Sequence, residues 1–187
     1  MKEFKTAAVW IFMAFLLSLT ACSPKESKEQ TVSNQMDGVE LVLSIPKQDV
    51  SLKGDFLANV VITNHNNAKV KIYAPIRADK KDGIAAVMAI KQKKWQMLNP
   101  VPGKDLPSVK KRTNYDFVLV ELEPNETIEQ AFTWNKQLFD QESQKNEAAE
   151  KGNYVLSAFV LLDDLKQQKE TYKPEKQIIA KFNFTVK

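Results

Sequence analysis

Two residue types that often carry out chemistry occur once each in this chain of 187 residues: one histidine, His65, and one cysteine, Cys22. A hydrolytic triad or a zinc site would need a nucleophile or further ligands, and the sequence contains no HxxxH, CxxC or GxSxG motif. His65 lies in the run NHNN, whose asparagines are typical of a turn. We therefore assign His65 no catalytic or metal-binding role and predict that the protein is not an enzyme.

Two pairs of acidic residues could in principle bind calcium or transfer protons. Asp163 and Asp164 are adjacent, and Asp79 and Asp82 flank two lysines. Neither pair has the alternating ligand spacing of a calcium loop, so we interpret both as turn residues. The five glycines form no run that could cradle a phosphate. The sequence thus predicts no metal and no cofactor, and it contains no recognisable module for binding nucleic acid.

The position of Cys22 indicates a different role for its thiol. Lys2 and Lys5 precede a short apolar run, residues 7–19, and small residues follow it, which is the organisation of a secretory signal. The run is shorter than the roughly 20 apolar residues that a membrane-spanning helix needs. The stretch LTAC, residues 19–22, resembles the lipobox of bacterial lipoproteins. The alternatives are an ordinary signal peptide or a buried helix, with an unrelated cysteine.

The lipobox resemblance implies that residues 1–21 are removed and that Cys22 carries a diacylglyceryl group. Two acyl chains anchor a protein stably, so the expected location is the extracytoplasmic face of the cell membrane. No thiol is then left for a disulfide. Residues 22–37 are polar and predict a flexible tether, and residues 38–187 are long enough for a single domain.

A basic stretch of the chain is followed by an acidic one. Residues 69–112 hold 12 Lys or Arg against 3 Asp or Glu, and residues 113–152 hold 3 against 9. The two stretches either complement each other on one surface, or the basic one forms a face for an anionic partner. In the basic stretch a tryptophan lies among cations, and we take these seven as candidate ligand-binding residues: Lys91, Lys93, Lys94, Trp95, Lys110, Lys111 and Arg112. Trp134 lies on an alternating strand and is the better candidate for the core.

Apolar residues at every second position dominate the chain after residue 38 and predict strands. Residues 56–63 and 68–73 flank NHNN as a predicted hairpin, and residues 85–98 form another with its tip at 92–94. Residues 153–162 and 178–186 are expected to pair as a long hairpin. Residues 115–122 are apolar on both faces, which favours a central strand. Residues 99–112 are interpreted as a loop, and residues 136–151 as the one helix, which Gly152 ends.

Seven to eight short strands with one short helical insertion predict an all-β fold, an immunoglobulin-like antiparallel β-sandwich. Five short features resemble the BsuPI-type intracellular proteinase inhibitor family over residues 55–162: Asn64, YDF at 115–117, LEPNE at 122–126, Trp134 and GNY at 152–154. This resemblance implies the same kind of sandwich. It also implies, by analogy, a protruding loop that could enter a protease cleft, for which residues 99–112 are the candidate.

These features lead to one functional hypothesis and two alternatives. The first is a lipid-anchored extracytoplasmic module without a catalytic site, which contacts a protein partner at the membrane or cell wall through a loop end or sheet edge. The second is a binder of an anionic wall polymer or lipid headgroup through residues 91–112. The third is a proteinase-inhibitor-like domain.

Overall fold

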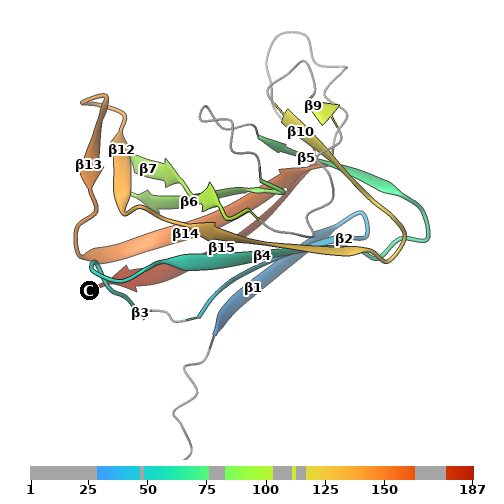
Figure 1. The fold of residues 1–187 in the computed structure, drawn as a ribbon, viewed down its shortest axis with the longest axis horizontal. Helices are drawn as coiled ribbons and strands as arrows, with labels where there is room; N and C mark the ends of the chain where they lie inside the picture. The colour runs from blue at the N-terminus through green and yellow to red at the C-terminus, as the bar shows by residue number, and fades with distance from the viewer. Residues whose placement is uncertain (1–28, 47–48, 76–82, 103–110, 113–116, 163–175) are drawn as a thin grey trace, which may run out of the picture.

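The computed structural model describes residues 29–46, 49–75, 83–102, 111–112, 117–162 and 176–187. The regular elements of this part of the chain are β-strands, arranged in two sheets (Figure 1). The first sheet has five strands in the order β1-β2-β4-β11-β8. Their bounds are Gln30–Met36, Val39–Ile45, Leu57–Asn64, Thr127–Thr133 and Asn99–Pro100, in that order.

The second sheet has ten strands, eight of which follow the path β13-β12-β7-β6-β14-β5-β10-β9. Their bounds are Lys145–Ala148, Gln137–Asp140, Lys94–Met97, Ala86–Lys91, Gly152–Leu161, Val70–Pro75, Phe117–Leu122 and Lys111–Arg112, in that order. The other two are β15, Gln177–Val186, which pairs with β14, and β3, Asp49–Val50, which runs parallel to β15.

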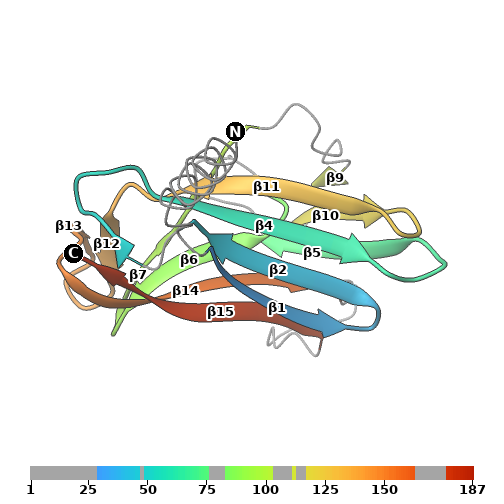
Figure 2. The ribbon, with the colours of Figure 1, turned by 90° about the horizontal axis from the view of Figure 1, so that it is seen from below.

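The two sheets face each other across one hydrophobic core (Figure 2). The inward residues of β2, β4, β14 and β15 recur at every second position, and nearly all of them are almost fully buried, with Phe182 half-buried. Trp134 is 4% exposed in this core, as predicted. The predicted fold class, an all-β antiparallel sandwich, is therefore confirmed, with fifteen strands in the described part of the chain rather than the predicted seven to eight.

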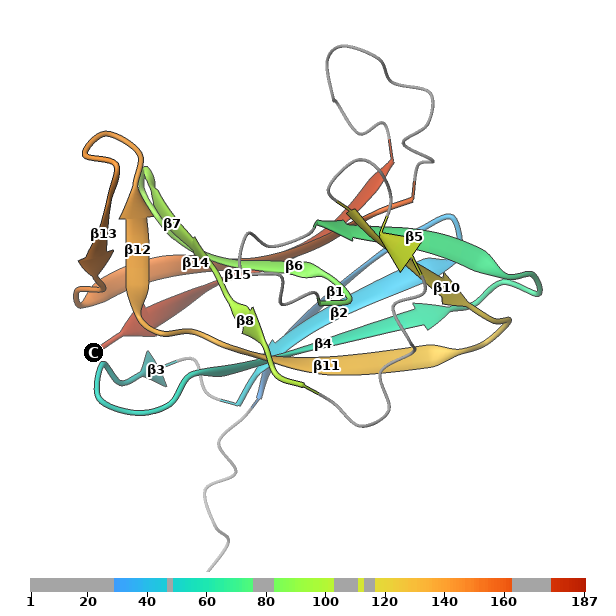
Figure 3. The same ribbon diagram turned by 45° about the horizontal axis from the view of Figure 1, so that its top comes forward.

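The ten-stranded sheet is strongly curled. Strands β12 and β13 stand up from one end of it, and β5, β10 and β9 lie at the other (Figure 3). Its centre is the long hairpin β14–β15, paired over ten residues from Gly152 opposite Val186 to Leu161 opposite Gln177. This hairpin and the β6–β7 hairpin, with Gln92 at its tip in a positive-φ conformation, both confirm predictions from the alternation pattern.

The helix predicted over residues 136–151 is wrong. These residues form the hairpin β12–β13, with Gln137 opposite Ala148 and Asp140 opposite Lys145. Lysine, glutamate, glutamine and alanine are good helix formers, and their propensity favoured a helix. Pairing of β12 with β7 overrides that propensity, because a strand can bury Leu138 in the core while Phe139 lies opposite Trp95.

Residues 30–36, which the sequence assigned to the tether, form β1. This strand pairs with β2 along its whole length, and its Val32 packs against the core. Two of its side-chain amides reach the second sheet: Asn34 Nδ2 donates to the carbonyl of Ile179 over 3.0 Å, and Gln30 Nε2 to that of Asn183 over 3.2 Å. Polar side chains of β1 thus join it to β15, and we call this contact the seam between β1 and β15. A pattern of apolar residues cannot predict such a contact.

Residues 56–63 and 68–73 do not pair as the predicted hairpin. Strand β4 pairs with β2 and β11, whereas β5 pairs with β10 and β14 in the other sheet. The intervening turn therefore crosses between the two layers. Strand β10 pairs with β5 and with the two-residue strand β9, so it lies near one end of its sheet rather than at the centre. Residues 99–112, predicted as loop, contribute the short strands β8 and β9.

A candidate interaction face

Part of the outer face of the ten-stranded sheet, opposite the main core, is also apolar, whereas β15 presents Lys181, Asn183 and Thr185 on that face. Because side chains alternate between faces, the residues between those of the core point outward. In register across β6 and β14, the outward pairs are Ile90 with Val155 and Met88 with Ser157. The three apolar members of these pairs are half-buried rather than buried. An antiparallel sheet more often has one apolar and one polar face, so this second apolar face requires an explanation.

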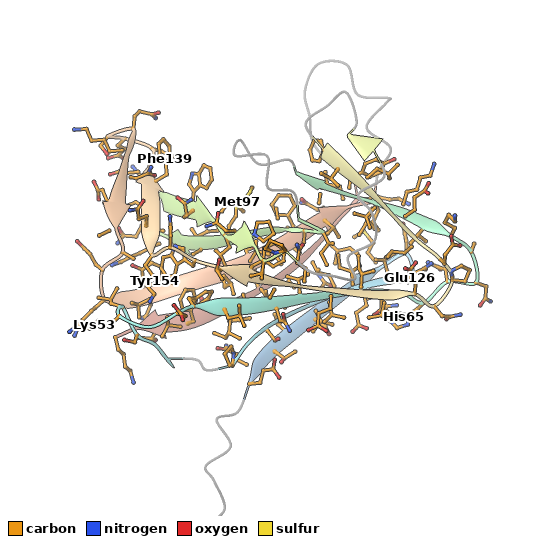
Figure 4. The ribbon with its side chains drawn as sticks, viewed as in Figure 1. Lys53, His65, Met97, Glu126, Phe139 and Tyr154 are labelled. Carbon is orange, nitrogen blue, oxygen red and sulfur yellow. The ribbon has the colours of Figure 1, made fainter. Side chains whose placement is uncertain are left out.

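One end of the outer face carries an aromatic group that we call the Trp95 cluster: Trp95, Met97, Phe139 and Ile90. Trp95 lies directly opposite Phe139 on β12 and opposite Ile90 on β6. The rings of Trp95 and Phe139 meet edge to face, with centroids 6.0 Å apart. Phe139 and Met97 lie on the same side of the sheet (Figure 4), and all four side chains are half-buried.

The other end of the outer face is a second, smaller apolar cluster. Tyr73 and Leu161 lie opposite each other on β5 and β14 and are 5% and 1% exposed. Three half-buried side chains pack around them: Phe117, Leu119 and Phe159. Strand β10 therefore places apolar side chains on both of its faces: some of its apolar residues lie in the main core, and the others lie in this outer cluster.

The structure separates the lysines of the predicted site from its tryptophan. Lys93 pairs with Glu142 at 2.5 Å, and Lys91 lies 3.5 Å from Glu150 and 5.3 Å from the centre of the Tyr154 ring. Each of these lysines thus has an acidic partner from residues 113–152. Only Trp95 of the described candidates contributes to the apolar outer face.

Lys94 lies in a small network of charges on the β7–β12–β13 strands. Its ammonium is 2.5 Å from Glu147 and 3.5 Å from Asp140. The hydrogen bond to Glu147 is the main cause that raises the pKa of Lys94. The backbone N–H of Glu142 donates to Asp140 over 2.9 Å and is the main cause that lowers the pKa of that carboxyl. The basic and acidic stretches therefore complement each other here, the first of the two interpretations of the charge pattern.

The remaining predicted residues are placed only in part. Cys22, Lys110 and the acidic pairs at 79, 82, 163 and 164 lie outside the described residues. Lys111 and Arg112 form β9, whose backbone pairs with Leu119 and Val118 of β10. The anionic-ligand and protease-loop hypotheses for residues 91–112 and 99–112 therefore stay predictions.

The remaining candidate for chemistry in the described part of the chain is His65. His65 lies in the connection between β4 and β5, and its Nε2 is 3.0 Å from the Glu40 carboxylate at an exposed position. Among the described residues, no three His, Cys, Asp or Glu side chains gather as a metal site would require. Within that same part, no helix has the length and hydropathy to span a membrane.

Comparisons with known proteins give no family. The chain matches no protein-family model and no curated protein. Solved structures that it matches include a β-glucosidase from Listeria innocua in complex with glucose, at 15% identity and a TM-score of 0.40 over 82% of this chain. A mutant of a β-glucosidase from the same organism, in complex with laminaribiose, matches at 15% identity and a TM-score of 0.38 over 83%. This chain spans 16% of the length of either enzyme, and likeness at this level carries no argument about function.

Proposed function

We propose that the protein is a non-enzymatic, lipid-anchored module outside the cytoplasm that binds a protein partner through the Trp95 cluster. The observation that carries this proposal is the half-buried group of Trp95, Phe139 and Met97 on the outer face of the sheet. Tryptophan, phenylalanine and methionine are enriched in protein interfaces, and tryptophan is frequent among the residues that dominate binding energy.

The surroundings of the Trp95 cluster fit a protein interface. Strands β7 and β12 are each four residues long, so the cluster lies on a narrow ledge at the end of the sheet. The pair of Lys93 with Glu142 joins the β6–β7 and β12–β13 turns beside it, and Lys94 pairs with Glu147 on the opposite face of the same strands. An apolar centre bordered by polar groups is the usual organisation of a protein–protein interface.

The lipid anchor contributes to the proposed function through concentration. Attachment at Cys22 would confine the module to a thin layer at the membrane, where it meets membrane or wall proteins at raised effective concentration. No catalytic group is needed for such a role. The resemblance to proteinase inhibitors agrees with a binding function but names no partner.

A photo-crosslinking residue in place of Phe139 tests the proposed interface in cells that carry the full chain. We expect a discrete protein adduct. Its yield should fall about tenfold or more when Trp95→Ala is added, because a tryptophan at the centre of an interface often contributes about 2 kcal/mol or more to binding. Trp95→Phe should retain most of it. A cooperative melting transition well above the growth temperature in each variant would show that the variants remain folded.

The matched control is the same crosslinker in place of Leu57, which is 45% exposed on the five-stranded sheet. The same adduct from both positions would contradict the proposal, because it would reflect mere proximity at the membrane. Adducts with lipid alone from position 139 would contradict it as well, since they would make the outer face a membrane contact.

The anchor has a separate test. Intact-mass measurement of the mature chain should give a polypeptide that begins at Cys22 with a diacylglyceryl group added, and Cys22→Ser should leave residues 1–21 attached. An unmodified thiol in the mature protein would contradict the lipid anchor. The proposed protein interface at the Trp95 cluster would not be affected by that result.

A further inference from the structure

A groove of about 420 Å³ lies at the end of the sandwich opposite Lys53. Its walls come from three parts of the chain that are distant in sequence: the β1–β2 turn, strand β5 and the ends of β14 and β15. The lining residues are Asp37, Val39, Lys69, Val70, Lys71, Tyr73, Leu162 and Lys176. A volume of this size falls in the range of small-molecule sites.

The groove is held by hydrogen bonds to backbone carbonyls. The β1–β2 turn has positive φ at both Asp37 and Gly38, the conformation of the tight turns that close hairpins. Asn66 Nδ2 donates to the Asp37 carbonyl over 2.9 Å, and the N–H of His65 donates to the Gly38 carbonyl over 2.8 Å. On the opposite wall, the N–H of Leu162 donates to the carbonyl of Lys176 over 3.0 Å. The walls are therefore largely preformed.

The groove has an apolar floor and a cationic border. Val39 and Tyr73 are buried, and Val70 and Leu162 are half-buried. Three lysines, Lys69, Lys71 and Lys176, line it against one carboxylate, Asp37, which leaves a net charge of +2 on the lining. Long lysine stems can cover apolar surface while the ammonium groups remain in water.

The three lysines differ in their partners. Lys176 pairs with Asp37 at 2.7 Å, and Lys69 pairs with Glu123 at 2.6 Å. The hydrogen bond between Lys69 and Glu123 is the main cause that raises the pKa of Lys69. Lys71 is exposed. Glu121 lies opposite it in the β5–β10 register, but among the described residues no carboxylate forms an ion pair with its ammonium. A cation above an apolar floor, without an ion pair of its own, is suited to an anionic group on an apolar body.

We infer that this groove binds a small amphiphilic anion, with its carboxylate or phosphate on Lys71 and its apolar body over Val70 and Tyr73. The ligand is either a free organic anion or the headgroup of an anionic lipid. The groove lies at the β5 end of the sheet, away from β7 and β12, so this inference does not depend on the Trp95 cluster.

Phenyl phosphate is the probe, measured by saturation-transfer NMR with the full chain in phosphatidylcholine vesicles. It should bind more tightly than both benzyl alcohol, which lacks the anion, and inorganic phosphate, which lacks the apolar body. Lys71→Gln should weaken the binding about tenfold, the usual size of one charge-assisted hydrogen bond. Lys53→Gln, an exposed lysine at the other end of the molecule, should leave it unchanged.

Equal binding by the two lysine variants, or equal binding of phenyl phosphate and benzyl alcohol, would overturn the inference. Adding phosphatidylglycerol to the vesicles separates the two sources of the anion. Competition with phenyl phosphate would support the groove as a headgroup site, and undiminished binding would support it as a site for a free anion.

Discussion

Replacing Trp134 with alanine is expected to lower the free energy of unfolding by about 4 kcal/mol, within the range for large aromatic side chains in cores. Three rings meet the indole: Tyr154 at 5.3 Å, Phe56 at 5.7 Å and Phe184 at 6.0 Å between centroids. Its Nε1 donates to the carbonyl of Gln137 over 2.9 Å. The loss is a large fraction of the roughly 5–15 kcal/mol that stabilises a typical domain.

Urea denaturation of the full chain measures this loss, with Trp95→Ala as the matched control. Trp95 is half-buried on the outer face, so its removal should cost about 1–2 kcal/mol, in proportion to the smaller area that it buries. Trp134→Phe keeps an aromatic ring and loses the Nε1 donor, and it should fall between the two. Equal losses for the two alanine variants would show that Trp134 is not the centre of the core.

Replacing Asn64 with alanine is expected to lower the free energy of unfolding by about 3 kcal/mol, because it leaves buried backbone groups without partners. Asn64 is 0% exposed. Its Nδ2 donates to the carbonyls of Ala68 and Glu123, each over 2.9 Å, and its Oδ1 accepts from the N–H of Asn66 over 2.9 Å. The side chain thus ties the turn after β4 to the turn before β11.

The matched control is Asn66→Ala, two residues away, whose amide makes one contact at the surface and whose loss should cost about 1 kcal/mol or less. Asn64→Asp gives a sharper test. Carbonyl oxygens around the new carboxyl favour its protonated form, so its pKa should be raised in the folded state.

The sign of the pH effect follows from that direction. A carboxyl with a raised pKa in the folded protein makes folding more favourable at low pH, and this contribution is lost as pH rises from its unfolded value of about 3.9. The destabilisation of Asn64→Asp relative to the natural protein should therefore grow between acid and neutral pH. A pH-independent difference would contradict the contacts described for Asn64.

The fold was predictable where apolar residues alternate over many positions. The long hairpin β14–β15 and the β6–β7 hairpin follow from such patterns, and so does the burial of Trp134. The failures share a different cause. In residues 136–151 the composition favours a helix, and only the partner strand β7 makes a hairpin more stable there. Pairing with a strand that is distant in sequence cannot be predicted from the local hydrophobic pattern.

The candidate interaction face was predictable only in part. Trp95 was identified by its type and its basic neighbours, but Phe139 was assigned to the predicted helix and so could not be placed beside it. The partner depends on the register of β12 against β7, which the sequence does not specify. The lysines next to Trp95 in sequence were easier to interpret. The basic stretch followed by an acidic one favours ion pairs between the two, and these lysines do pair with acidic residues.

The seam between β1 and β15 determines how the domain responds to a pull on the chain ahead of Gln30. Such a load enters at the first residue of β1 and acts on the pairing of Gln30 with Ile45 and on its side-chain bond to Asn183 before it reaches the core. Detachment of β1 would uncover the edge of β2, whose inward residues Leu41, Leu43 and Ile45 are buried. Strand β1 is therefore expected to detach first under load. Single-molecule force spectroscopy should record its release before the remaining strands unfold.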